Sequence, residues 1–193
     1  GASFPFSPTG VIHFSYGHFF QVPRFEMLYM NPDFDLSQGT GNIGVVGNAD
    51  LRPEKTIQGE LGLQQQITNN MAIDITAYFR DIRDLAGTRS EEISLFGGSA
   101  SYNKLENSDF AYVRGLVLSL QMREYKGFSG NLDYTFQIAK GSASDPQQAR
   151  NAIAGGSLPE IQMIPLDWDQ RNTVNLSLAY DKKRWGISGI YQL

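Results

Sequence analysis

The acidic pair Asp167 and Asp169 is the part of this sequence that comes nearest to a catalytic motif. The two residues flank Trp168, and paired carboxylates can share the work of a general acid and a general base when a histidine or another polar partner completes the set. The sequence offers no such partner nearby, and the chain holds 2 histidines and no cysteine nucleophile. The pattern therefore favours an anchor where a loop enters a strand, and we expect neither a catalytic residue nor an enzymatic activity.

Two other spacings are those of ligand motifs. Gly39, Gly41 and Gly44 have the spacing of a nucleotide-binding glycine motif, but they neither follow a clear strand nor open a helix. His13 and His18 are separated by an odd number of positions, so a strand would place the two rings on opposite faces. The absence of cysteine also excludes thiolate metal sites and disulfides. We therefore expect a flexible glycine loop, no metal site and no cofactor.

Four aromatic residues lie in segments that lack a strand pattern, and their side chains could stack on a ligand. They are Tyr29, Tyr102, Phe110 and Trp168. Binding residues are often carried on loops that a rigid scaffold positions. Loop aromatics also pack against their own neighbours, so this second use stays open. These four residues are our candidate ligand-binding residues.

The elements that must position these residues are strands, and the stretch from Thr56 to Arg80 shows this best. Apolar and polar residues alternate along it, with one interruption at Asn69-Asn70. A period of two gives a strand one apolar face and one polar face, whereas a helix would mix these residues on each face. Asparagine tolerates the left-handed backbone of a tight reversal. The stretch therefore predicts an antiparallel hairpin that turns at the two asparagines.

The same alternation predicts five more strands, which makes seven. They cover Val11 to Tyr16, Ala111 to Glu124, Phe128 to Ile138, Val174 to Asp181, and Trp185 to Leu193. Turns of about three residues at 68–70, at 125–127 and at Lys182-Lys183 alternate with connections of about thirty residues at 17–53, 81–110 and 140–169. Compact soluble domains rarely contain structureless loops beyond about 12 to 15 residues. Outer-membrane barrels have short turns on one rim and long loops on the other, so the lengths favour a barrel.

Composition and charge are consistent with this interpretation. A net charge of -4 over 193 residues gives no basic footprint for nucleic acid. No run of about 18 apolar residues predicts a transmembrane helix. The polar strand faces carry Gln, Asn, Ser and Thr, as a barrel lumen does, and the lysines lie at strand ends, turns or loops. Aromatics near strand ends fit either interfacial girdles or an ordinary core; they are Tyr78, Phe79, Phe128, Tyr180, Trp185 and Tyr191.

Four segments of the chain, taken in order, closely resemble the barrel region of TonB-dependent outer-membrane receptors. They are FSYGHFFQVPRFEMLY, GNADLRPEKTIQGELGLQ, AYFRDIRDL and LDWDQRNTVNLSLAY. In that family an Asn-x-x-Leu-x-Pro-Glu-Lys run enters a barrel strand, and here it begins at Asn48 and ends at Lys55. Asn172 departs from the histidine that the family pattern has after Asp-Gln-Arg. The resemblance covers nearly the whole chain.

The resemblance implies that residues 1–193 are a partial β-barrel domain, about seven antiparallel up-and-down strands from the later part of a barrel of about 22 strands. An open sheet with an apolar face would leave unpaired edges that hydrocarbon does not tolerate, which also predicts a piece of a larger barrel. The family's plug domain and TonB-engaging segment have no counterpart in this chain.

The whole receptor would lie in the outer membrane of a Gram-negative bacterium, in contact with its lipid, and would import a scarce solute with energy from the TonB complex. Iron chelates, cobalamin and glycans are the solutes that the family suggests. We expect no nucleic-acid partner. The alternative function is that of a soluble or surface β-rich binding module, such as a sandwich, with long recognition loops.

Overall fold

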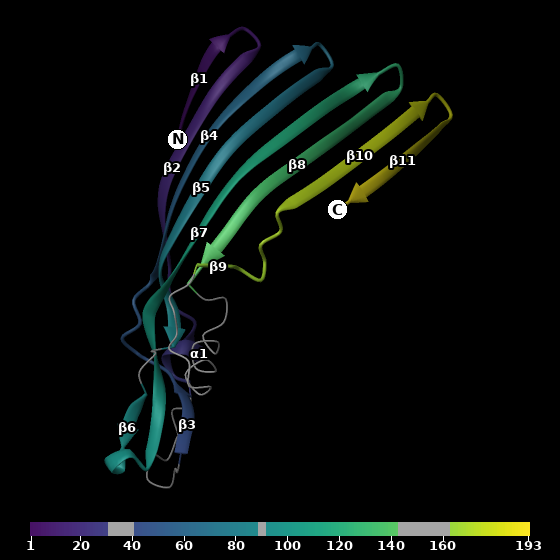
Figure 1. The fold of residues 1–193 in the computed structure, drawn as a ribbon. Helices are drawn as coiled ribbons and strands as arrows, with labels where there is room; N and C mark the ends of the chain where they lie inside the picture. The colour runs from purple at the N-terminus through teal and green to yellow at the C-terminus, as the bar shows by residue number, and fades with distance from the viewer. Residues whose placement is uncertain (31–40, 89–91, 143–162) are drawn as a thin grey trace.

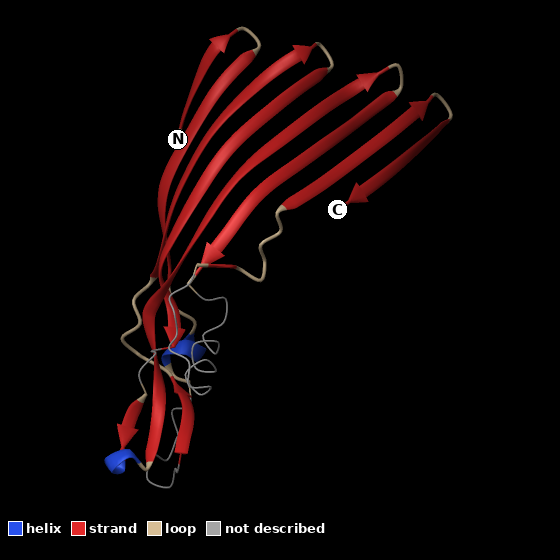
Figure 2. Cartoon of the chain, viewed as in Figure 1, coloured by secondary structure: helices blue, strands red, loops and turns tan. Residues whose placement is uncertain are grey.

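Strands make up about three quarters of the described chain. The computed structural model describes residues 1–30, 41–88, 92–142 and 163–193. Its strands are β1 Ala2–Ser7, β2 Gly10–Gln21, β3 Gly41–Val46, β4 Glu54–Thr68, β5 Met71–Thr88, β6 Ile93–Leu95, β7 Ala100–Tyr125, β8 Phe128–Gly141, β9 Ile164–Pro165, β10 Asn172–Lys182 and β11 Trp185–Gln192. A four-residue helix α1 (Phe25–Leu28) and a 3-10 turn at Phe96–Gly98 are the helical parts in these ranges (Figure 2). Neither is long and apolar enough to cross a membrane.

The main strands form one antiparallel up-and-down sheet that is open at both edges, and β3 joins β7 in parallel. Its order is β1-β2-β4-β5-β7-β8-β10-β11, with β3 and β6 attached to β7 and β9 to β8. In Figure 1 the eight main strands spread as a fan, and β1 and β11 form its edges. The predicted fold is confirmed, with one more main strand than the seven expected. The additional strand is β1, which alternates between Phe4 and Phe6 on one side and Ser3, Pro5 and Ser7 on the other. It contains a proline, which is tolerated on edge strands.

The two faces of the sheet differ in polarity. Residues opposite one another on paired strands point to the same side. One row across seven strands is apolar: Phe4, Ile12, Leu63, Ile75, Leu118, Tyr134 and Val174. The adjoining row on the other side is Ser3, His13, Gly62, Thr76, Val117, Thr135 and Thr173. The sheet therefore has an apolar face and a polar face, and it places Ile75 and Thr76 on opposite sides, as the alternation predicts.

Four short reversals share one rim of the sheet, and the long connections share the other (Figure 1). The last reversal is at Lys183 and Arg184, one position later than predicted, because Lys182 still pairs with Trp185. The turn at Asn69-Asn70 is confirmed, but its reason is different. Neither asparagine has a positive φ; instead the Asn70 side chain donates to the Glu124 carbonyl at 2.7 Å.

The predicted connection of about thirty residues at 81–110 is wrong, because β5 and β7 continue to pair well past Arg80. Their register shifts between Ile82 and Leu85, then pairing resumes and reaches Thr88 opposite Leu105. Asp84 has a φ of 59°, which is typical of the sharp local turn of a bulge. The bulge interrupts the period of two, so alternation alone ends the strand too early. In Figure 1 this extension leaves the sheet as a narrow ribbon that carries β3 and β6.

Burial of apolar side chains is confined to the long-connection end of the described sheet. The buried apolar side chains in the described ranges are Val45, Leu51, Ala100, Leu105, Ala111, Val113, Ala139 and Leu166. Farther along the strands, large apolar side chains such as Leu61 and Leu116 are exposed. The interior of the molecule therefore lies at the rim, and the fan itself is a single layer.

Candidate functional site at the long-connection rim

The four candidate aromatic residues lie in three separate parts of this rim. Tyr29 follows α1 and stacks on Phe25, with ring centroids 6.5 Å apart. Tyr102 and Phe110 both lie in β7, where eight residues of strand span about 26 Å. Trp168 lies in the connection before β10 and is more than half exposed. The structure therefore places two of the four in a strand and joins none of them directly, and ligand binding by these residues stays a prediction.

The first long connection is held to the β5–β7 ribbon by a small apolar cluster. Val45, Leu51 and Leu105 are buried together, and the α1 residues Met27 and Leu28 pack against them. Asn48 fixes the geometry from inside this cluster: its side-chain amide donates to the Leu105 carbonyl at 2.9 Å and its carbonyl oxygen accepts from the Asp50 N–H at 3.0 Å. The Asn-x-x-Leu motif thus has a structural role, because its asparagine and its leucine both anchor the connection.

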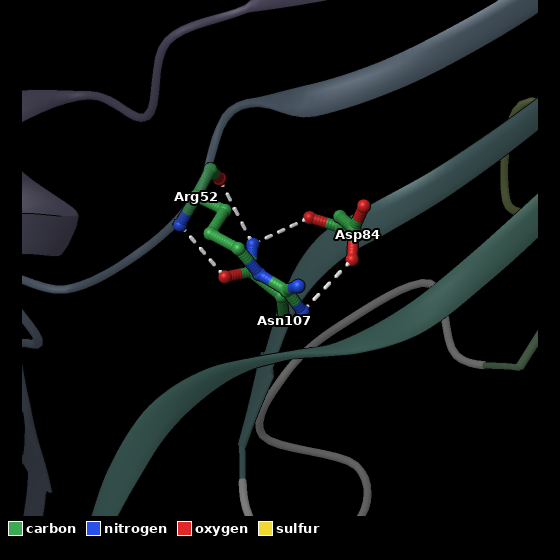
Figure 3. Close-up of polar contacts among 3 residues, drawn as sticks. All are labelled: Arg52, Asp84 and Asn107. Atoms are coloured by element: carbon green, nitrogen blue, oxygen red, sulfur yellow. Dashed lines mark hydrogen bonds and ion pairs between the residues drawn. The ribbon is translucent and has the colours of Figure 1, made fainter.

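A polar clamp continues this anchor at the bulge in β5 (Figure 3). The Asn107 side chain accepts from the Arg52 N–H at 2.8 Å and donates to the carbonyls of Arg52 at 3.0 Å and Asp84 at 2.7 Å. The Arg52 guanidinium also pairs with the Asp84 carboxylate at 3.2 Å, in an exposed position. Sequence analysis missed Asn107 and Asp84, since neither carries a motif and their roles depend on the bulge.

A second apolar cluster closes the rim over the polar face. Leu166, from the connection between β8 and β10, packs on Ala111, Val113 and Ala139. Its backbone N–H donates to the Ala139 carbonyl at 3.1 Å. The connection therefore folds back against β8 where β10 has not yet begun to pair.

Asp169 fixes this second connection, as an anchoring role for this member of the acidic pair requires. Its carboxylate accepts from the Ala139 N–H at 2.8 Å and from the Arg171 guanidinium at 3.2 Å. The Ala139 N–H holds the pKa of Asp169 below its ordinary value; burial opposes this shift, while Arg171 and Lys140 add to it. The carboxylate is therefore held in its ionised form by structural partners, which is the role of an anchor.

The polar face carries hydrogen-bonded carboxylates, as a wet lumen wall does. Asp133 accepts from Ser119 at 2.6 Å, Glu60 accepts from Ser15 at 3.1 Å, and Asp74 accepts from Thr76 at 2.8 Å. Carboxylates that accept hydrogen bonds from hydroxyl groups are compatible with a water-filled channel. The same charged groups would be costly to place against hydrocarbon.

Tyr78 corrects one expectation about aromatic girdles, because it belongs to the polar face. Its hydroxyl donates to Gln137 at 3.0 Å. At the short-turn end, Phe128, Tyr180 and Trp185 do gather, with ring centroids 4.5 Å and 5.6 Å apart. An aromatic group of this kind is typical of the membrane–water interface.

The remaining ligand motifs do not form sites in the described ranges. His13 contacts Thr76 at 3.2 Å on the polar face, and His18 contacts Tyr16 at 3.0 Å on the apolar face, so the two rings are on opposite sides as predicted. Gly39 lies outside the described residues, and Gly41 begins a strand, β3, instead of a helix. Among the residues that the structure describes, no three histidine or acidic side chains gather as metal ligands.

Comparisons with known proteins agree with this architecture. Residues 1–193 match the family described as TonB dependent receptor-like, beta-barrel. An iron-regulated outer membrane virulence protein of Vibrio cholerae serotype O1 is 27% identical over 128 residues, which cover 63% of this chain and 19% of that protein. A mutant of the ferric enterobactin receptor of Pseudomonas aeruginosa, in complex with enterobactin, superposes with a TM-score of 0.70 at 18% identity, over 98% of this chain and 26% of that one. The siderophore receptor PirA of Acinetobacter baumannii gives 0.68 at 16% identity, over 98% and 27%.

The chain spans about a fifth of the curated relatives and about a quarter of the solved receptors. A sandwich, the alternative fold, would need a second sheet against the apolar face, but the described strands all join in one sheet. The family match, the single layer and its two faces lead to the same conclusion. This chain belongs to the TonB-dependent receptors as a part of their β-barrel, in the outer membrane of Gram-negative bacteria.

Proposed function

We propose that the protein containing this chain imports a ferric chelate across the outer membrane, with energy supplied by the TonB complex. The observation that carries the proposal is the two-faced sheet, with an apolar outer face, a lumen wall of hydrogen-bonded polar residues, and all long connections on one rim. A barrel built from such strands is a conduit whose long loops meet solute outside the cell.

The substrate class is suggested by the relatives. The curated relative is named for iron regulation, and two of the solved receptors are named for siderophores or ferric enterobactin. A solved copper transporter shares the fold as well, with a TM-score of 0.61. A ferric chelate is therefore our proposed solute, and cobalamin and glycans are the alternatives that the experiment must separate.

Uptake by whole cells tests the proposal. The complete receptor would be expressed in a strain that lacks its own ferric-chelate receptors, with and without TonB, and accumulation of radiolabelled iron chelates, cobalamin and glycans would be measured. We expect uptake of at least one ferric chelate that depends on TonB. Uptake of cobalamin or a glycan alone would overturn the substrate class, and no uptake of any of them would overturn import.

Two equally exposed aromatic residues, one at each rim, provide a matched pair of variants. Trp168 and Tyr125 are each 54% exposed, but Trp168 lies at the long-connection rim and Tyr125 at the short-turn rim. We expect Trp168→Ala to weaken solute binding by the intact receptor and Tyr125→Ala to leave it unchanged, because solute arrives at the long loops. The reverse result would invert the orientation of the barrel.

A further inference from the structure

A basic hollow lies on the apolar face of the sheet, near its long-connection end. Its volume is about 690 Å³, and Arg80, Ala111 and Met163 form part of its lining. The other lining residues, all on the apolar side of their strands, are Phe79, Asp81, Arg83, Phe110, Tyr112 and Arg114. We call these six residues the basic hollow. It is not part of the lumen wall, and the import function described above does not use it.

The strand register fixes the face on which the hollow opens. Phe79 is opposite Arg114, and this pair comes directly after the apolar pair Ala77 and Leu116 in the ladder. Two residues of strand span about 7 Å. The hollow therefore begins where the apolar band of the outer face ends, on the side of the long connections.

Positive charge gathers around the hollow from four neighbouring strands, beginning with an arginine on β5 and an arginine on β7. Arg83 binds Asp81 through two hydrogen bonds of 3.0 Å, and its side chain is still 62% exposed. Arg114 lies over the Tyr112 ring at 5.4 Å.

Two lysines extend the charge on either side of the hollow. Lys55 is opposite Arg83, and Lys140 is opposite Tyr112. Asp81 and Asp84 act electrostatically on Arg83, and Asp169 acts on Lys140. The four cations therefore exceed these three carboxylates by one.

The position of the hollow in the sheet excludes other strands of the barrel as its cover. The hollow lies on β5 and β7, which are paired on both sides, by β4 and β8 and by each other (Figure 1). Further strands would add at the edges β1 and β11, and the outer face over β5 and β7 would stay toward lipid. At this depth the neighbours of a barrel are lipid headgroups, and cations at this level attract anionic ones.

We propose that the basic hollow binds a phosphate group on the headgroup of an outer-leaflet lipid. The two guanidinium groups present the planar donor geometry that suits phosphate oxygens. Phe79, Phe110 and Tyr112 offer apolar surface beside them, and the acyl chains continue along the band that begins at Leu116. The assignment to the outer leaflet follows the orientation of the barrel in the proposed function, but the binding itself depends on neither orientation nor import.

Lipid binding to the complete receptor in detergent tests the proposal. Native mass spectrometry would count bound lipid A with both phosphates, the same lipid after removal of its phosphates, and phosphatidylglycerol. We expect the bisphosphorylated lipid to bind more tightly than its dephosphorylated form, which has the same acyl chains. Equal binding of the two forms would overturn the proposal, and tighter binding of phosphatidylglycerol would overturn the outer-leaflet assignment.

Inorganic phosphate separates a lipid site from a free-anion site. We expect it to displace the lipid only at concentrations far above those of the lipid, since the ion lacks the chains that lie on the apolar band. Displacement by inorganic phosphate at concentrations similar to the lipid's would overturn the assignment to a lipid.

A charge-matched pair of double variants locates the site. Arg83→Gln with Arg114→Gln should weaken binding of the bisphosphorylated lipid by about 30-fold, at about 1 kcal/mol per cation near the surface. Lys183→Gln with Arg184→Gln removes the same charge from the turn at the opposite rim and should leave binding unchanged. Equal effects of the two double variants would overturn the site. If the arginine variant fails to assemble, the comparison of lipids on the unchanged receptor still decides the proposal.

Discussion

In the fan of strands, Leu61 and Leu116 are 57% and 42% exposed, whereas Leu105 and Leu166 at the long-connection rim are 3% and 6% exposed. The fan has no second layer, so its apolar side chains are buried only when lipid covers them. The rim buries its leucines within the chain, under α1 and the connections. One polypeptide thus combines a region stabilised by its ladder and by lipid with a region stabilised by an ordinary small core.

This difference predicts which substitutions affect assembly in the membrane and which affect only the loops. A change on the apolar face of the fan should act through lipid. A change in the rim clusters should release a connection while the barrel stays assembled. The four predictions below test that division, from the largest expected effect to the smallest.

Ile75→Lys should break the fan. Ile75 lies on the apolar face near the middle of β5, and lysine at a lipid-facing site near the midplane costs about 2 to 4 kcal/mol. The control is Thr76→Lys on the polar face, where the new cation lies near Asp74 and should cost much less. The free energy of unfolding of the complete receptor in lipid would be measured for both variants.

Cysteine labelling sharpens the same test. A thiol at position 75 should react with a lipid-soluble reagent, and a thiol at position 76 with a water-soluble one. An aqueous reagent that reaches position 75 in intact membranes would show that the two faces are assigned wrongly, even if both lysine variants are unstable.

Leu105→Ala should loosen the rim and leave the fan intact. The side chain is almost fully buried between Val45 and Leu51, and the substitution should cost about 2 kcal/mol, at the low end for buried leucine because the cluster is small. Limited proteolysis should cut the first connection sooner, while the assembled receptor keeps its resistance to detergent. Loss of assembly would show that the two regions are not separate.

The contacts among Arg52, Asp84 and Asn107 at the bulge allow backbone hydrogen bonds to be compared with an exposed ion pair. Asn107→Ala removes three hydrogen bonds to the backbone of Arg52 and Asp84 and should cost about 1 to 2 kcal/mol of local stability. Arg52→Ala removes only the exposed pair with Asp84 and should cost less than about 0.5 kcal/mol. Hydrogen exchange of the amides in residues 50–53 would measure both, and a larger effect of Arg52→Ala would contradict the ranking.

The smallest effect concerns pH at the second connection. Because the Ala139 N–H lowers the pKa of Asp169, ionisation of this carboxylate favours the folded connection. This stability is complete above the ordinary pKa of aspartate, about 3.9, and is lost as pH falls through the lower folded value. Acrylamide quenching of a fluorescent unnatural amino acid at position 168 of the complete receptor should therefore rise below pH 4 in the parent and be independent of pH in Asp169→Asn. A parent signal that does not change with pH would contradict this linkage.

The strands of the fan follow from the sequence because their cause is local. A period of two needs only a residue and its next neighbours, and it places Ile75 and Thr76 on opposite faces in any sheet that has one apolar side. The position of the Asn69-Asn70 turn also follows from the sequence, although its Asn70 side chain donates to the distant Glu124 carbonyl. The family pattern at Asn48 and Leu51 indicated the barrel itself. The order of the eight main strands needs little further information, because strands that are neighbours in an up-and-down sheet are also neighbours in the sequence.

The rim depends on contacts between residues far apart in the sequence, so only the tertiary structure decides it. Asn107 meets Arg52 across 55 positions, and this contact exists because a bulge at Asp84 shifts the register of β5 on β7. The same extension turned Tyr102 and Phe110 from expected loop residues into strand residues and brought Phe110 beside Arg83 and Arg114. Alternation specifies which side of a strand a residue faces, but a bulge changes the pairing beyond it, and that shift has no periodic signature in the sequence.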